Sequence, residues 1–351
     1  MLALDPLSIV PQGAASAVVL PSLCTPHGQV PLSGPNPHEN KDLQKDTVVR
    51  WLDDNGYMAK GSQVLNCGQN YVHLKDKNGH EKYGKMHCSN EFCPTCGQKG
   101  SRAHKTRSTR ARDRLMWAPV LGYTIFTLPK EIAQSKLTPK MLNRLEKESY
   151  NIVKNNFKAE GGMVRIHLMG DDVGTLKTHI NVLFPLLGTN GIGKVDVTII
   201  EAARKDWTNF INDYFCLTLK TTDIHYNFAT TSKKKAHKIK YVLRPIVDAF
   251  MFMTLSDQDK HYILSLKGWH NTRWYGQLSN NSYKQYLKAK GVNPTKYEDD
   301  DIYLSNKCPV CGERFRYVDI VHKNDLPLYR LRRIDNDTLV DFEVYAALKT
   351  K

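Results

Sequence analysis

The stretch from residue 163 to residue 187, MVRIHLMGDDVGTLKTHINVLFPLL, restricts the fold more than any other part of this chain. Apolar side chains recur at every second position on both sides of the insert GDDVGT, a pattern typical of two strands joined by a hairpin turn. We therefore predict an antiparallel sheet with one face on a core and the other face open for chemistry. The predicted core face carries Val164, Ile166, Leu168, Ile180, Val182 and Phe184.

The polar positions of the same two strands carry His167, His179 and Asn181. A hairpin folded about Val173 places His167 opposite His179, because the two histidines are equally far from that residue. A slip of one residue would turn one of them towards the core. The pair has two interpretations: the histidines are metal ligands, or they are ordinary hydrogen-bonded residues on the surface of a sheet.

Four cysteines within the first hundred residues have the spacing of a zinc site. In the turn CPTCG, two thiolates separated by two residues can bind one ion, while proline and glycine permit a tight bend. Four protein ligands leave no position for a substrate, so we expect a structural zinc; the alternative is a reduced cysteine cluster without metal. The expected ligands are Cys67, Cys88, Cys93 and Cys96, with His73, His80 or His87 as a substitute for one of them.

A second CxxC pair, Cys308 and Cys311, lies near the C-terminus without two evident partner ligands. His322 could contribute one ligand. Alternatively, the pair could close on Cys93 and Cys96 to form a single zinc ribbon.

The charge balance predicts a polyanionic partner. Lysine and arginine number 50 against 35 aspartates and glutamates, a formal net charge of +15, which favours binding to phosphates. No apolar run approaches the roughly 20 residues that span a bilayer, and no secretory signal is present, so we expect a cytoplasmic protein without a membrane partner. A run of almost exclusively positive charges follows the CPTCG turn, which we call the first knuckle. This run is expected to contact DNA phosphates, and the alternative is a solvated charged face. It contains Lys99, Arg102, Lys105, Arg107, Arg110, Arg112 and Arg114.

Periodicity and turn residues predict the remaining elements. We expect strands at residues 122–129, 195–200 and 217–222, and helices within residues 41–57, 138–157 and 201–215.

A further helix is expected from Thr231, with Ser232 as its N-cap. Lys234, Lys238 and Tyr241 fall at spacings of four and three, so they share one helix face. A tyrosine among lysines, beside a sheet that carries candidate metal ligands, is a candidate nucleophile, because nearby positive charge favours the phenolate. The alternative is an ordinary amphipathic tyrosine on a basic helix.

The order of these motifs resembles that of the HUH endonucleases, the nickases of rolling-circle replication initiators and single-strand transposases. The resemblance covers about residues 60–315 and rests on FTLP, THIN, KYVLRP, the cysteine module before them, and GWHNTRWYGQLSN followed by CPVCG. It implies an α+β fold, a palm of antiparallel strands flanked by helices, with a small N-terminal zinc-binding module. The implied division is a flexible arm at 1–45, the zinc module and basic segment at 46–115, the nickase domain at 116–290 and a C-terminal region at 291–351.

The resemblance also implies a reaction. Tyr241 would attack a DNA phosphodiester, form a 5′-phosphotyrosine and free a 3′-hydroxyl, with Mg²⁺ or Mn²⁺ orienting the scissile phosphate. The implied ligands of that metal are His179, Asn181 and His167, with Asp171 or Asp172 as substitutes for the last.

Two departures from the family pattern affect the functional prediction. The family has histidine at both ends of its motif, whereas THIN offers His179 and Asn181, and an amide oxygen is the weaker donor for softer metals. Transposases of this branch commonly carry two tyrosines four residues apart, whereas His237 lies one turn before Tyr241.

A single nucleophile favours an initiator of rolling-circle replication, carried by a plasmid or virus of a prokaryotic cell. The alternatives are a transposase with the same chemistry and a zinc-containing nucleic-acid-binding protein that cuts nothing. The expected partners are single-stranded or hairpin DNA at a replication origin or element end, and a host helicase.

Overall fold

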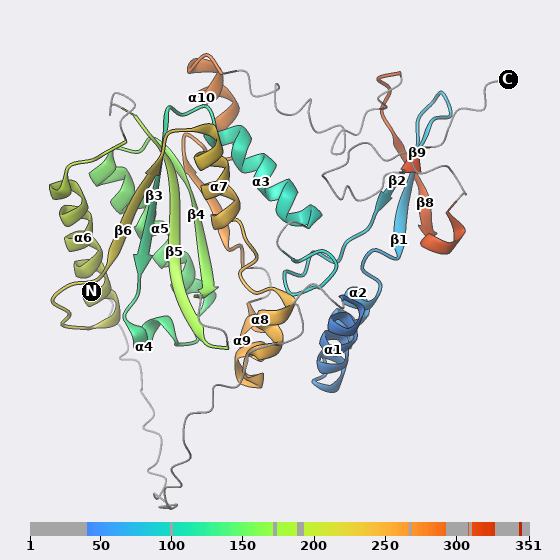
Figure 1. Ribbon diagram of the computed structural model, residues 1–351, viewed down its shortest axis with the longest axis horizontal. Helices are drawn as coiled ribbons and strands as arrows, with labels where there is room; N and C mark the ends of the chain where they lie inside the picture. Colours follow the sequence, from blue (N-terminus) through green and yellow to red (C-terminus); the bar gives the residue numbers. More distant parts are fainter. Residues whose placement is uncertain are drawn as a thin grey trace, which may run out of the picture. The chain divides into compact units, whose positions relative to one another are not determined.

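A five-stranded antiparallel sheet carries the histidine hairpin, as the computed structural model shows (Figure 1). Its strand order is β6-β3-β5-β4-β7, so the two hairpin strands β4 and β5 lie side by side and β5 is central. The predicted register is confirmed, because His167 pairs with His179 and Val164 pairs with Val182. The strands are β3 (Val120–Thr127), β4 (Gly161–Met169), β5 (Leu176–Leu186), β6 (Ile224–Ala229) and β7 (Thr272–Gly276).

The structure describes residues 41–98, 101–170, 174–187, 193–266, 269–292, 308, 311–326 and 344–345. The expected N-terminal arm up to residue 40, Lys99 and the substitute ligands Asp171 and Asp172 lie outside these residues.

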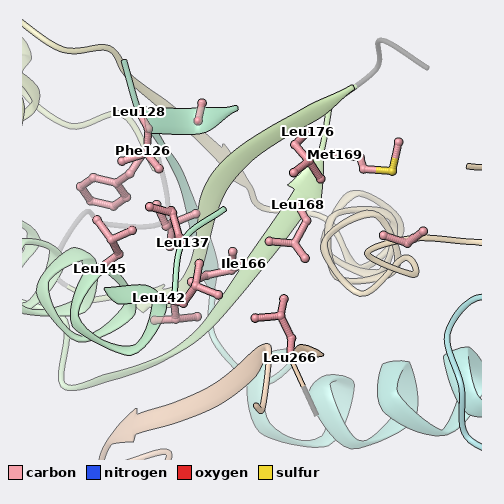
Figure 2. Close-up of a cluster of buried hydrophobic side chains, with 14 of the residues drawn as sticks. Phe126, Leu128, Leu137, Leu142, Leu145, Ile166, Leu168, Met169, Leu176 and Leu266 are labelled. Atoms are coloured by element: carbon pink, nitrogen blue, oxygen red, sulfur yellow. The ribbon is translucent and has the colours of Figure 1, made fainter. Parts of the chain in front are cut away.

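One face of the sheet packs on α5 (Pro139–Phe157) and α6 (Val197–Phe215). Thr138 caps α5 through its side chain, which accepts a hydrogen bond from the backbone N–H of Met141, and Pro139 occupies the first turn. Figure 2 shows the resulting core, in which Leu142 and Leu145 of α5 lie near Ile166 of β4. The predicted apolar face of the hairpin is therefore the core face.

The opposite face was expected to be open, and this was wrong. α3 (Arg102–Leu115), α7 (Ser232–Val242) and α10 (Tyr283–Ala289) pack their apolar residues on that face. As a result Arg165 and Asn181 are fully buried and His167 is 1% exposed. Alternation identifies the two faces of a strand, but a polar face is not an exposed face when its groups find hydrogen-bond partners.

A second sheet, of order β8-β1-β2-β9, joins segments from both ends of the chain. β8 pairs with β1 from Asn70 opposite His322 to Lys75 opposite Arg316. The regions expected at 46–115 and at 291–351 therefore contribute strands to one sheet. The strands are β1 (Asn70–Lys75), β2 (Glu81–Lys85), β8 (Arg316–His322) and β9 (Val344–Tyr345).

The described residues contain five further helices. α1 begins at Lys41, although the arm was expected to reach residue 45. Gly56 follows the end of this helix with a φ of 81°, a left-handed conformation that commonly ends helices. The helix expected within 41–57 is therefore present. None of the described helices is long and apolar enough to cross a membrane. The set comprises α1 (Lys41–Asp54), α2 (Met58–Leu65), α4 (Lys130–Ala133), α8 (Ala249–Thr254), α9 (Asp257–Ser265) and a 3₁₀ turn at Lys323–Asp325.

Two predicted strands are wrong. The expected strand at 195–200 is largely the first turn of α6, because Asp196 caps the helix by accepting a hydrogen bond from the backbone N–H of Thr198 at 2.9 Å. The expected strand at 217–222 is irregular, and β6, which pairs with the edge of β3 opposite β5, begins two residues further on.

Candidate functional site

The paired histidines lie at the end of the β4–β5 hairpin, with ring centroids 5.1 Å apart and ring planes nearly perpendicular. Nε2 of His167 is 2.8 Å from the carbonyl oxygen of Val242, the residue after Tyr241. Because a carbonyl only accepts, Nε2 carries the proton and Nδ1 keeps its lone pair. Nδ1 has no hydrogen-bond partner among the described residues.

His179 is oriented in the same way by a backbone carbonyl. Its Nδ1 lies 3.0 Å from the carbonyl oxygen of Lys177, so Nδ1 donates and the lone pair is on Nε2. Burial lowers the pKa of His167 well below its ordinary value, and the neighbouring His179 lowers it further. A neutral imidazole with a fixed tautomer is the form in which histidine binds a metal.

Asn181 makes a different set of contacts. Its Oδ1 accepts a hydrogen bond from the hydroxyl of Tyr123 at 2.6 Å, and its Nδ2 donates to the carbonyl of Arg165 at 3.5 Å. Burial, and then the nearby Tyr241, raise the pKa of Tyr123, which keeps the donating proton in place. The amide oxygen expected to bind a metal therefore already serves as an acceptor within the protein.

Tyr241 is half-buried in the last turn of α7, where the guanidinium carbon of Arg244 lies 4.7 Å from the centroid of its ring. Lys238 lies on the same side of the helix, with Nζ 4.9 Å from the ring of Tyr123. The helix begins one residue earlier than expected, because its cap is Thr231 and not Ser232.

Other groups on and near α7 have structural contacts. Nζ of the buried Lys235, which sequence reasoning did not single out, donates to the carbonyls of Met116 and Ala118, whereas Lys234 is exposed. The hydroxyl of Tyr226, the nearest tyrosine upstream of Tyr241, donates to the carbonyl of Gly193, and burial raises its pKa to about 12.

The four expected zinc ligands come together. The Sγ atoms of Cys67, Cys88, Cys93 and Cys96 all lie within 4.8 Å of one another, so this cluster could hold a metal such as zinc. Gly97 closes the knuckle, since a Cβ at this position would overlap the carbonyl of Glu91. Hydrogen bonds from Cys67 and Cys88 lower the pKa of Cys93, which favours a thiolate there.

The basic residues after the knuckle divide into two groups on α3. Lys105, Arg110 and Arg112 are exposed, whereas Arg107 is partly buried and forms an ion pair with Glu91 at 3.3 Å. The guanidinium of Arg114 stacks 3.9 Å from the ring of Tyr283 and 4.5 Å from that of Trp274. The side chain of Arg102 lies outside the described part of the structure.

A cavity of about 630 Å³ opens beside α3. Its lining combines Arg107, Arg110 and Arg114 with Trp269 and Trp274. Guanidinium groups bind phosphates and indole rings stack on bases, so this cavity combines both kinds of nucleic-acid-binding group.

Sequence reasoning missed a buried ion pair between the first cysteine knuckle and the sheet. Glu91, two residues before Cys93, lies 3.2 Å from Nη2 of the fully buried Arg165 on β4. Its Oε2 also accepts a hydrogen bond from the backbone N–H of Ile246 at 2.6 Å. Burial opposes ionisation of Glu91, but Arg165 and Arg107 outweigh it and lower its pKa. Nothing in the sequence joins a knuckle glutamate to a strand arginine.

Among the described His, Cys, Asp and Glu residues, groups of three or more that could hold a metal occur at two places. Neither includes His167 or His179, so the expected Mg²⁺ or Mn²⁺ site stays a prediction. The second place is formed by Asp76, His80, Cys308 and Cys311. The partners of the C-terminal cysteine pair are therefore Asp76 and His80, and neither His322 nor the Cys93–Cys96 turn belongs to this group.

Comparison with known proteins gave no match, whether against protein-family models, curated proteins or solved structures, so the site is interpreted from its own residues and geometry.

Proposed function

We propose that the protein is a metal-dependent nickase that cuts single-stranded DNA through Tyr241 and starts rolling-circle replication of a plasmid or virus. The observation that carries this proposal is the hydrogen bond from His167 to the carbonyl of Val242. It joins the histidine pair on β4 and β5 to the turn of α7 that bears the tyrosine, so the metal site and the nucleophile would move as one unit.

The reaction balances without a further reactant. The Tyr241 oxygen attacks the scissile phosphorus and loses its proton, while the bond from phosphorus to the 3′-oxygen breaks. That oxygen takes up a proton and leaves as a 3′-hydroxyl, and the 5′-phosphate stays on the tyrosine. Arg244, stacked on the Tyr241 ring, supplies a positive charge close to the attacked phosphate.

The histidine pair fits a divalent metal in part. Nδ1 of His167 is buried with no hydrogen-bond partner among the described residues. Together with Nε2 of the paired His179, it would hold Mg²⁺ or Mn²⁺. The metal would polarise the scissile phosphate. Asn181 would be the third ligand only if its oxygen bound the metal in addition to the Tyr123 hydroxyl.

The DNA-binding part of the proposal is supported by the charges of α3 and by aromatic groups in the cavity beside it. Lys105, Arg110 and Arg112 are exposed on this helix, and Arg110 also lines the cavity that contains Trp269 and Trp274. A groove of this composition suits single strands, because every base can stack on an indole and every phosphate can meet a guanidinium.

A second function has one specific observation in its favour. The hydrogen bond between Tyr123 and Asn181 occupies the position at which the resembled family has its second histidine. A chain that lost its metal site in this way would be a zinc-containing nucleic-acid-binding protein that does not cut.

The test is incubation of the full chain with Mn²⁺ and single-stranded DNA from the flanks of its own gene, followed by denaturing electrophoresis. We expect a covalent protein–DNA adduct and a free 3′-hydroxyl. Tyr241→Phe removes only the attacking oxygen, so it should bind DNA as before and form no adduct. Tyr214→Phe, on the exposed surface of α6, is the matched control and should form the adduct normally.

A wild-type chain that binds this DNA but forms no adduct with Mn²⁺ or Mg²⁺ would favour the non-cutting function. An adduct that survives in Tyr241→Phe would mean that another tyrosine is the nucleophile.

A further inference from the structure

Four metal-binding side chains outside the proposed site come together from opposite ends of the chain. They are Asp76 and His80, in the turn between β1 and β2, and Cys308 and Cys311, just before β8. One ligand atom from each lies within 4.8 Å of the other three. The sequence separation of more than two hundred residues makes this a tertiary feature.

The turn at Asp76 is built to hold its carboxylate in place. Oδ1 accepts hydrogen bonds from the backbone N–H groups of Asn78 at 2.8 Å and His80 at 2.9 Å. Gly79, with a φ of 87°, permits the tight bend between them. Oδ2 then lies 2.7 Å from Nδ1 of His80 and 3.0 Å from Sγ of Cys311.

The second cysteine pair shares one backbone hydrogen bond with the first knuckle. The N–H of Gly312 donates to the carbonyl of Cys308 at 2.8 Å, and the N–H of Gly97 donates to the carbonyl of Cys93 at the same distance. Sγ of Cys311 lies 3.4 Å from Nδ1 of His80. The carboxylate of Asp76 is fully buried and Cys308 is 3% exposed, whereas His80 is partly buried and Cys311 is exposed, so the cluster is open to solvent on one side.

We propose that Asp76 Oδ2, His80 Nδ1, Cys308 Sγ and Cys311 Sγ bind one structural zinc ion. Two sulfurs, one imidazole nitrogen and one carboxylate oxygen are ligands that zinc accepts in a tetrahedral site. The thiolates exclude Mg²⁺ and Ca²⁺, which require oxygen ligands. Binding releases the two thiol protons to solvent.

The site explains how β8 is held on β1. Most of β8 is exposed, including its large apolar residues Tyr317, Val318 and Ile320, at 64%, 46% and 53%. Burial of apolar surface therefore contributes little to this edge of the sheet. A metal bound by residues that flank both strands supplies the missing free energy, as it does in other small metal-dependent folds.

The test is to count zinc in the full chain by native mass spectrometry and elemental analysis. We expect two zinc ions per chain, one at the first knuckle and one at this site. The double variant Cys308→Ser/Cys311→Ser should lose one of the two, whereas Cys216→Ser, at an exposed solitary cysteine, should keep both.

A second measurement needs no variant. Zinc X-ray absorption of the wild-type chain should give an average of three sulfur ligands and one nitrogen or oxygen ligand per zinc, since one site offers four sulfurs and the other two. One zinc per chain with four sulfur ligands, and alkylation of Cys311 as fast as that of Cys216 in the native protein, would overturn the proposal.

Discussion

At the residue scale, Asn181 decides how the site is interpreted. Its place opposite Arg165 and beside His179 on one face could be predicted from the period of the strands, and the register confirms it. Its partner could not be predicted, because Tyr123 comes from β3, and nothing in a strand pattern says which tyrosine lies within 2.6 Å of the amide.

Asn181→Ala separates the structural function of this residue from metal binding. Removal of the amide leaves the buried Tyr123 hydroxyl without its acceptor, so we expect the free energy of unfolding to fall by about 1–3 kcal/mol. Mn²⁺ affinity measured by titration calorimetry should stay unchanged, whereas His179→Ala should weaken it. Urea unfolding gives the stability change, and Asn227→Ala, at an exposed position of β6 in the same sheet, is the control and should change it by less than about 0.5 kcal/mol.

A loss of Mn²⁺ affinity in Asn181→Ala equal to that in His179→Ala would instead make Asn181 a ligand. The hydrogen bond to Tyr123 would then belong to the metal-free state alone.

At the scale of elements, the sequence predicts helices and strands where periodicity and caps agree, and fails where they conflict. β3 and α5 have both a clear period and a capping or terminating residue, and both are confirmed. The run from Val195 to Ile200 is rich in β-branched residues, which favours a strand, but the Asp196 cap starts a helix there. A local cap outweighs a weak propensity when the helix has a buried face to pack.

The exposed basic residues of α3 are predicted to set the salt dependence of DNA binding. Replacing Lys105, Arg110 and Arg112 with Ala should reduce the slope of log affinity against log salt concentration by about 0.7 for each lost phosphate contact on single-stranded DNA. Arg107 is left in place, because it neutralises Glu91. Filter binding or fluorescence anisotropy at several salt concentrations measures the slope.

The matched control changes three exposed lysines of α5, Lys140, Lys147 and Lys154, which lie on the helix that packs against the other face of the sheet. It removes the same charge and should leave the slope almost unchanged. Equal loss of slope in both triple variants would show that net charge, and not α3, governs binding.

At the scale of the whole molecule, long-range contacts are what the sequence could not predict. Cysteine spacing identified the first metal cluster, because its ligands lie within thirty residues of one another. The partners of Cys308 and Cys311 stayed open, since an aspartate and a histidine in a distant hairpin turn have no spacing rule that links them to a CxxC pair. The contact between Glu91 and Arg165 is of the same kind.

That contact predicts a large effect from a small substitution. Glu91→Gln keeps an acceptor for the backbone N–H of Ile246 but leaves the fully buried Arg165 without its counter-charge. We expect the free energy of unfolding to fall by about 3 kcal/mol. Glu148→Gln is the control, since Glu148 pairs with the half-exposed Arg144 at 3.9 Å and its loss should change the free energy by less than about 1 kcal/mol.

Urea unfolding of the three proteins, followed by tryptophan fluorescence, measures both changes. Similar small effects of Glu91→Gln and Glu148→Gln would mean that the first cysteine knuckle is held to the sheet by its apolar contacts and not by this ion pair.

The most direct test of the proposed function is to locate the covalent bond between protein and DNA. After reaction with Mn²⁺ and single-stranded origin DNA, the chain is digested with nuclease and protease, and the peptides are sequenced by mass spectrometry. The proposal predicts that the nucleotide mass is carried by Tyr241 and by no other of the chain's 17 tyrosines. A nucleotide on any other residue, or unmodified Tyr241 in a preparation that has bound and cut the DNA, would contradict it.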